Sequence, residues 1–296
     1  MDETTYWQLH GLGGEAVEEA RLSDAARLFA AAEAEARRLG KPALADRAFC
    51  NQAAVRYREG SATGIREGLS RILGSSPDAR ARELAAYNLA VLFRRRQRLG
   101  VARFYGETAL RQACSLGEGS IQAVCLDFLG RLRIQEGRTS EGVALFEQSL
   151  EVAQVEVSVR RALTLGNLAY CSSVAGRRSE ALRLLEEGLK VFARSPSLLY
   201  EPGIRLNAGF TLLEAGEPEA ALANGRHALN QCAVESFGGE GKYALYLVGE
   251  ALVQQGDRSE AKEHFVQLQR RYYPQIPDLP DLLLTCRTHV FLNWLA

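Results

Sequence analysis

The chain has 296 residues, with 36 basic and 36 acidic side chains, so its formal net charge at pH 7 is zero. This balance disfavours nucleic acid as a partner. No apolar run reaches the roughly 18–20 residues that a membrane-spanning helix needs, so we expect no membrane association. Ala, Leu, Arg and Glu are abundant and Pro occurs only 8 times. Such a composition is typical of helices and excludes a fold built mainly of strands.

Six cysteines stand at positions 50, 114, 125, 171, 232 and 286. None belongs to a CxxC pair and none has a histidine at metal-ligand spacing. The acidic N-terminus, Met1-Asp2-Glu3, has no apolar stretch that would make it a signal peptide. These features predict reduced, buried thiols in the cytoplasm and no metal site. No grouping of Ser, His and Asp indicates catalysis, so we expect neither an enzyme nor a cofactor.

A repeat of about 40 residues runs through the chain. A small or apolar anchor residue opens a helix after each polar turn, at Ala25, Ile65, Ala102, Gly142, Ala181, Ala221 and Ala261. The residue twelve positions before each anchor is always Gly or Ala, at positions 13, 53, 90, 130, 169, 209 and 249. Antiparallel helices that cross closely need a residue without bulk at the crossing. A large residue four positions after the anchor, such as Phe29 or Phe146, can then enter that space.

The predicted elements, in chain order, are seven helix pairs and a final single helix. The pairs cover residues 6–37, 46–73, 83–114, 122–154, 161–194, 203–233 and 242–272. The turn inside five pairs is expected at Gly60, Gly137, Gly176, Gly216 and Gly256, because helices commonly end in a left-handed residue. Ala20 and Gln97 hold that position in the first and third pairs. After a Pro-rich stretch over 273–280, a strongly apolar helix over about 281–295 is expected to cap the seventh pair.

The repeat resembles the tetratricopeptide repeat (TPR) family. Residues 165–189, which read LGNLAYCSSVAGRRSEALRLLEEGL, and residues 249–265 are similar to the consensus of that family. The long period and the Leu-Gly-Asn start are similar to the subgroup of kinesin light chains, Pins-type polarity adaptors and MalT-like bacterial regulators. The resemblance implies an all-α, right-handed superhelical solenoid that binds other proteins. We expect it to form a single domain over residues 1–296.

The first helix of each pair lines the inner, concave wall in a solenoid of this kind. Fourteen residues before the anchor, four of the seven positions are asparagine: Asn51, Asn88, Asn167 and Asn207. Asn costs roughly half a kcal/mol against Ala inside a helix, so its recurrence needs a reason. The resemblance implies a ladder of amides that binds the main chain of an extended peptide. The alternative is that each Asn bonds to a neighbouring helix and sets the stacking angle.

Arginine and aromatic residues are predicted on or near the same wall. Besides the four asparagines, we expect the peptide-binding side chains to be Arg47, Tyr87, Arg94, Arg131, Tyr170, Phe210 and Tyr246. Residues 41–118 hold 14 basic and 7 acidic residues, net +7, whereas residues 1–40 and 201–296 each carry net −4. The wall therefore favours an acidic or phosphorylated peptide. The run from Arg94 to Arg96 has an alternative role as a solvated helix end that complements the helix dipole.

These features predict an adaptor or scaffold that binds a peptide or a partner helix in its concave groove. The alternative is a sensor module that binds a signalling peptide or small effector and controls a partner's output domain. No output domain is recognisable between Met1 and Ala296, which favours the adaptor. A homodimer formed through the terminal repeats is a further alternative.

Overall fold

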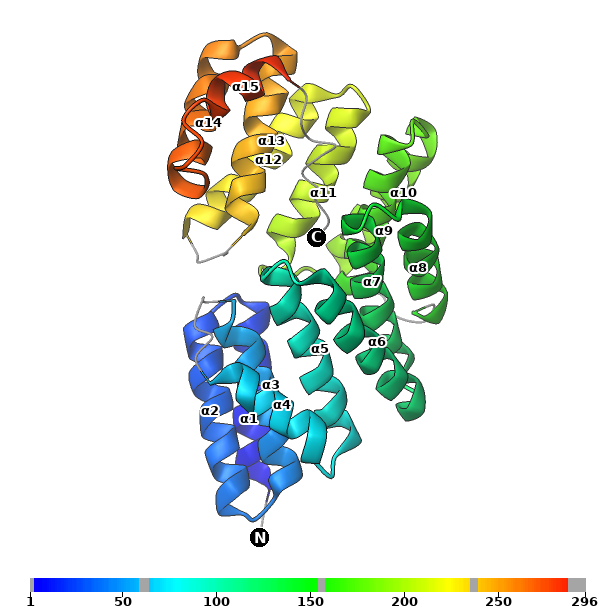
Figure 1. Cartoon of the computed structure of the whole chain (residues 1–296), viewed down its shortest axis with the longest axis vertical. Coiled ribbons are helices and arrows are strands. Elements are labelled where there is room, and N and C mark those ends of the chain that lie inside the picture. Colours follow the sequence, from blue (N-terminus) through cyan, green and yellow to red (C-terminus); the bar gives the residue numbers. More distant parts are fainter. Residues whose placement is uncertain (1–2, 59–63, 154–157, 235–238, 287–296) are drawn as a thin grey trace. The chain divides into compact units, whose positions relative to one another are not determined.

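The computed structural model of the chain describes residues 3–58, 64–153, 158–234 and 239–286. Over these residues the fold is entirely α-helical, with fifteen helices and no strand (Figure 1). The helices are α1 (Thr4–Glu18), α2 (Leu22–Arg38), α3 (Pro42–Arg56), α4 (Ile65–Ser75), α5 (Ala79–Arg95), α6 (Leu99–Leu116), α7 (Gly119–Gln135), α8 (Thr139–Val152), α9 (Val159–Val174), α10 (Arg178–Arg194), α11 (Glu201–Glu214), α12 (Pro218–Val234), α13 (Glu240–Gln255), α14 (Arg258–Tyr272) and α15 (Leu279–Thr285). The predicted succession of seven helix pairs and a further helix is confirmed.

The chain divides into two compact units, Met1–Val155 and Glu156–Ala296. The N-terminal unit contains the four pairs from α1 to α8, and the C-terminal unit contains the pairs from α9 to α14 together with α15. Within each unit, the two helices of a pair pack against each other, and the second helix of a pair contacts the first helix of the next pair. A single domain over residues 1–296 and a right-handed superhelix stay predictions.

Small residues lie where the two helices of a pair cross. A Cβ atom built on Gly13 would lie 2.8 Å from Phe29 Cε1, and one built on Gly130 would lie 2.7 Å from Phe146 Cε1. Phe29 and Phe146 are almost wholly buried. The predicted fit of a large residue from the second helix into a gap on the first is therefore confirmed in these pairs.

The turn inside each described pair uses the left-handed backbone conformation. Gly137, with φ of +79°, is one of four predicted turn glycines found in this region. Ala20 and Gln97 adopt the same conformation, with φ of +57° and +58°, although they carry side chains. This position of the repeat thus adopts the left-handed backbone conformation whether or not it holds glycine. Gly60 lies outside the described residues.

The final helix, α15, begins two residues earlier than predicted. It packs against α14 and α13, and Leu283 is 5% exposed. The Arg258 Nη2 donates to the Leu284 carbonyl at 2.9 Å, which ties the helix to the seventh pair. Residues 287–296, which make up most of the predicted cap, lie outside the described residues.

All six cysteines are free thiols, but the expectation that every one is buried is wrong. Cys50, Cys125, Cys171 and Cys232 are buried. Cys114 and Cys286 are exposed because they lie near helix ends rather than on the packed faces. Among the described helices, none is long and apolar enough to cross a membrane.

Candidate peptide-binding site

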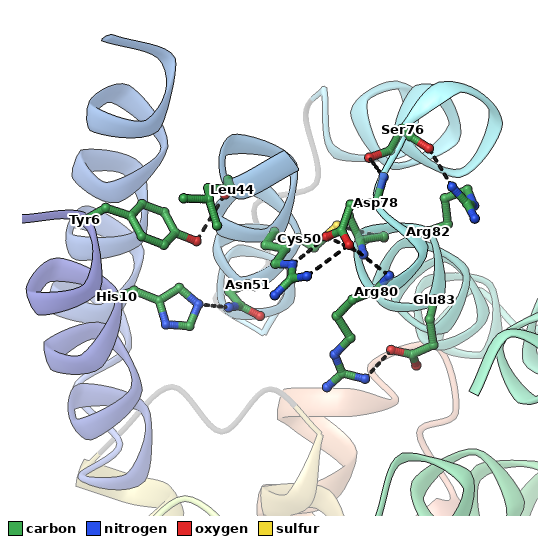
Figure 2. Close-up of polar contacts among 12 residues, drawn as sticks. Tyr6, His10, Leu44, Cys50, Asn51, Ser76, Asp78, Arg80, Arg82 and Glu83 are labelled. Atoms are coloured by element: carbon green, nitrogen blue, oxygen red, sulfur yellow. Dashed lines mark hydrogen bonds and ion pairs between the residues drawn. The ribbon is translucent and has the colours of Figure 1, made fainter. Parts of the chain in front are cut away.

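The first helices of the N-terminal pairs are α1, α3, α5 and α7. They lie against one another and form one surface, which we name the wall. Between α1 and α3, His10 Nε2 lies 2.9 Å from Asn51 Nδ2 (Figure 2). Helices α3 and α5 are in direct contact. Between α5 and α7, the ring centroids of Tyr87 and Phe128 are 5.6 Å apart. The predicted side-by-side arrangement of first helices therefore exists within this unit.

The predicted asparagines direct their amides between neighbouring helices. The Asn88 Nδ2 donates to the Cys50 carbonyl at 2.8 Å, and the Asn207 Nδ2 donates to Asn167 Oδ1 at 3.0 Å. Asn88, Asn167 and Asn207 are 3%, 0% and 1% exposed, whereas Asn51 is half-buried. This geometry supports the alternative in which the amides hold adjacent pairs together. Binding of a peptide main chain by these amides stays a prediction.

In two pairs, the repeat position that is Asn in four others holds a large apolar residue. Each of these pairs follows a pair that has Gly in place of the large residue four positions after its anchor. The two apolar residues are Phe128 and Leu247. A Cβ atom on Gly106 would lie 3.1 Å from Phe128 Cε1, and one on Gly225 would lie 3.2 Å from Leu247 Cγ. Gly106 and Gly225 stand where other pairs carry a phenylalanine or leucine. The larger residue of the next pair fills the vacated space, so this repeat position serves packing between pairs.

Arg47 is bound by Asp78 at the start of α5. Its Nε and Nη2 both donate to the carboxylate, with Nη2 2.9 Å from Asp78 Oδ1. The same carboxylate accepts the backbone N–H groups of Arg80 and Ala81 and thereby caps the helix. Burial acts to raise the pKa of Asp78, but Arg47 and the two N–H groups hold it below its ordinary value. A peptide carboxylate would have to compete with Asp78 for Arg47.

Three predicted wall residues gather around a ring that the sequence prediction did not include. Tyr87 meets Phe128 edge to face, and the guanidinium carbons of Arg94 and Arg131 lie 5.9 and 6.0 Å from the centroid of the same ring. Phe128 is fully buried, whereas Tyr87 and Arg94 are half-buried. Arg131 also forms an ion pair with Asp127 at 3.0 Å. We name Tyr87, Arg94, Phe128 and Arg131 the aromatic–arginine cluster.

The sequence carried a signal for Phe128 that points to packing and not to binding. Phe128 occupies the repeat position that is Asn in four other pairs, directly after a pair with Gly106 in place of a large residue. Its neighbours could be found only in the folded chain, because they come from two helices about 40 residues apart.

The predicted aromatic residues of the C-terminal unit pack on one another. The ring centroids of Tyr170 and Phe210 are 6.0 Å apart, and those of Phe210 and Tyr246 are 6.3 Å apart. The Tyr246 hydroxyl donates to Glu250 Oε2 at 3.2 Å. The three rings are 5%, 1% and 1% exposed, and burial raises the pKa of Tyr170. These side chains form a packed row across α9, α11 and α13, and their contact with a peptide stays a prediction.

Solved structures place this architecture in a known class. A Rap protein in complex with competence and sporulation factor matches with a TM-score of 0.71 and 10% identity, over 99% of this chain and 83% of that chain. RapI in its apo form matches with a TM-score of 0.57 and 12% identity, over 97% and 84%. A tetratricopeptide repeat protein from Parabacteroides merdae matches with a TM-score of 0.55 and 17% identity, over 95% and 100%.

The helix pairs, their crossings and these structural neighbours define an all-α helical repeat of the solenoid class, with the tetratricopeptide repeat fold. The predicted family resemblance is thereby confirmed at the level of the fold. No protein-family profile and no curated protein matches the sequence.

Proposed function

We propose that the protein is an interaction scaffold that binds an extended, acidic peptide of a partner protein across the aromatic–arginine cluster. The observation that carries this proposal is the clustering of Tyr87 and two guanidiniums around Phe128 on adjacent first helices. Tyr and Arg are the side chains that most often dominate binding interfaces. The half-buried positions of Tyr87 and Arg94 leave part of each side chain for a partner.

The acidic preference rests on the arginines near the cluster and on the net charge of +7 over residues 41–118. Arg47 and Arg131 already have internal carboxylate partners, Asp78 and Asp127. The Arg94 guanidinium lies over the Phe128 ring in a cation–π contact, which limits the positions that the side chain can take. A peptide carboxylate at Arg94, with an apolar or aromatic neighbour on Tyr87, is the arrangement that we expect.

A displayed library of random peptides, selected on the full chain, tests this proposal. Acidic peptides should be enriched, and one selected peptide should bind the Arg94→Gln variant about tenfold more weakly, the effect of losing one charge-assisted contact. Arg111→Gln is the matched control, since Arg111 is an exposed arginine on the second helix of the same pair and its guanidinium donates to Thr108 of that helix. Equal loss in both variants, or enrichment without any acidic bias, would contradict the proposal.

A second candidate is a sensor module that binds a signalling peptide or effector and controls a partner. The observation in its favour is the structural match to the Rap protein in complex with competence and sporulation factor, which covers 99% of this chain and 83% of that chain. The two candidates differ in the effect that peptide binding has on a second protein. A sensor releases or engages a second protein when its peptide is added, whereas an adaptor holds both.

We infer binding rather than catalysis, and the cytoplasm as the compartment. The resemblance of the fold to solved TPR proteins supports a binding role. Six free thiols, two of them exposed, support a reducing compartment. Alkylation of the exposed Cys114 thiol in intact cells, compared with the purified protein under reducing conditions, tests the compartment. Failure of Cys114 to react in cells would contradict a reducing compartment.

A further inference from the structure

The turn between α5 and α6 carries an unusual concentration of positive charge. Helix α5 ends at Arg95, Arg96 follows as its C-cap, and Arg98 directly precedes α6. We name Arg95, Arg96 and Arg98 the arginine turn. All three are exposed. Between them, Gln97 holds the left-handed conformation that glycine holds in four other turns.

The equivalent turns of three other pairs neutralise the arginine that precedes the second helix. In each of them an acidic residue three positions later forms an ion pair with it. The pairs are Arg21–Asp24 at 3.0 Å, Arg138–Glu141 at 2.7 Å and Arg177–Glu180 at 3.2 Å. In the arginine turn, the residue three positions after Arg98 is Val101. The internal acid that the repeat normally supplies is absent at this position.

Aromatic rings hold two of the guanidiniums in place. The Arg95 Cζ lies 5.4 Å from the centroid of Tyr57, and its Nη1 donates to the Tyr57 carbonyl at 2.9 Å. The Arg98 Cζ lies 5.9 Å from the centroid of Phe93. Within the part of the chain that the structure describes, none of the three guanidiniums lies close enough to a carboxylate for an ion pair. The nearest influence is on Glu67, which pairs with Arg66 and whose pKa is lowered by a backbone hydrogen bond, by Arg66 and, more weakly, by Arg96. A guanidinium over a ring keeps N–H groups at its edge for a second partner and loses less freedom when it binds.

Complementing the helix dipole does not account for this arrangement. A cation at a helix C-terminus is favourable, and α2 also ends in two arginines. Those two, Arg37 and Arg38, are paired with Glu33 and Glu35. At the end of α2 the helix dipole is therefore complemented by arginines that are also ion-paired. The dipole alone gives no reason why three neighbouring arginines form no ion pair at the end of α5.

We propose that the arginine turn binds a phosphoryl group on a side chain of the bound peptide. Three adjacent cations repel one another, and a dianionic phosphoryl group offsets more of that repulsion than a single carboxylate does. Phosphate oxygens also accept the paired N–H groups of a guanidinium edge. A nucleic acid is the poorer fit, because binding it draws on an extended basic surface and the chain has zero net charge. This inference rests on the proposed function and adds that the bound peptide carries a phosphoryl group.

The test uses the full chain and O-phospho-L-serine, with the arginine Nε–Hε signals followed by NMR. The signals of the arginine turn should shift saturably, with an affinity about tenfold higher than for L-aspartate. The triple variant Arg95→Gln, Arg96→Gln, Arg98→Gln should lose this binding at least tenfold. Val101→Glu, which supplies the acid found in the other turns without removing an arginine, should weaken binding several-fold. Arg138→Gln, at the equivalent turn with its own acidic partner, is the control and should bind normally.

Equal shifts with sodium chloride at the same ionic strength, or equal affinity for aspartate and phosphoserine, would overturn the proposal. Binding of a single-stranded oligonucleotide that tightens with its length would also overturn it, in favour of a polyanion site. Melting temperatures of all variants identify loss of binding that comes from unfolding, and Val101→Glu keeps the test decisive if the triple variant is unfolded. Phosphoserine needs no peptide main chain, so this test can fail while the acidic peptides selected on the full chain still bind.

Discussion

Glu83, in the second turn of α5, is a carboxyl group that the fold buries. It is 2% exposed and forms an ion pair with Arg80 at 2.7 Å (Figure 2). The Cys125 Sγ of α7 lies 3.9 Å from its Oε1. Burial, only partly offset by Arg80 and strengthened by the nearby charge of Glu118, raises its pKa from 4.5 to about 7. A carboxyl group with a raised pKa favours the folded state when it is protonated. Its contribution to stability is therefore present below pH 4.5 and lost as the pH rises through about 7.

Glu83→Gln should remove this pH dependence, because the amide stays neutral. We expect the variant to gain unfolding free energy relative to the native chain as the pH rises from about 4.5 to about 8, by on the order of 2–3 kcal/mol. Chemical denaturation of both proteins at several pH values gives the difference between their unfolding free energies. Groups that titrate alike in both proteins cancel in this difference. A constant difference across the range would show that Glu83 is not perturbed.

The buried asparagines give a second prediction at the residue scale. In Asn167→Ala with Asn207→Ala, the amide hydrogen bond of 3.0 Å between α9 and α11 is lost. We expect the melting temperature to fall, by the equivalent of about 1–2 kcal/mol, the net worth of one or two buried hydrogen bonds. If stability is unchanged while binding of a selected peptide falls 10- to 100-fold, the ladder interpretation holds instead. Asn224→Ala is the control, because this exposed amide on α12 donates to the Ala220 carbonyl of its own helix.

At the scale of the helix pair, the close approach of α7 and α8 depends on two glycines. A Cβ atom on Gly142 would lie 2.8 Å from the Gly130 carbonyl oxygen and 2.6 Å from Ile134 Cδ1. A backbone atom cannot give way as a side chain can, so the helices themselves would have to separate. The spacing of small residues along the repeat is therefore a condition for the crossing, and not a consequence of helix propensity.

Gly142→Ala should accordingly lower the unfolding free energy by about 1–3 kcal/mol. Gly14→Ala is the matched control, because Gly14 also lies inside a helix and a Cβ atom there would meet nothing within 4 Å. That control should be stabilising by up to about 1 kcal/mol, since Gly is the poorer helix former. Denaturant titration of both variants checks the pair. Stabilisation by both substitutions would mean that the crossing tolerates bulk.

For the whole molecule, the open question is whether seven pairs act as one domain. The chain divides into two compact units, each with its own packed pairs. In a solenoid, stability comes from each repeat and from its interfaces with its neighbours, so cooperativity can extend along the stack or stop at a weak interface. The prediction of a single domain over residues 1–296 requires that it extend through all seven pairs.

The Gly142→Ala substitution tests this as well. A single domain should unfold in one transition, and the amides of α11 and α13 should lose protection from hydrogen exchange together with those of α7. The exchange of each helix can be followed by mass spectrometry of peptide fragments. Loss of protection that is confined to the N-terminal unit would show two independent domains and contradict the prediction.

The sequence alone was enough to predict the helix pairs, their order, the crossings and the turns. These depend on spacing along one pair: a small residue such as Gly130 meets Phe146 because both belong to the same 40-residue repeat. The absence of an acid after Arg98 can also be read directly from the sequence. Local periodicity is a reliable guide to such features because the partners are close in the chain and their geometry is that of the helix itself.

Only the tertiary structure decided what the wall residues contact. Arg47 is 31 residues from Asp78, Asn88 is 38 from Cys50, and Asn207 is 40 from Asn167. Whether an amide faces a groove or a neighbouring helix depends on how successive pairs rotate and pack, and that rotation is set by side chains of both pairs together. The same residue type at the same repeat position is therefore compatible with a binding ladder or a packing contact, and the buried hydrogen bonds of this fold favour the contact.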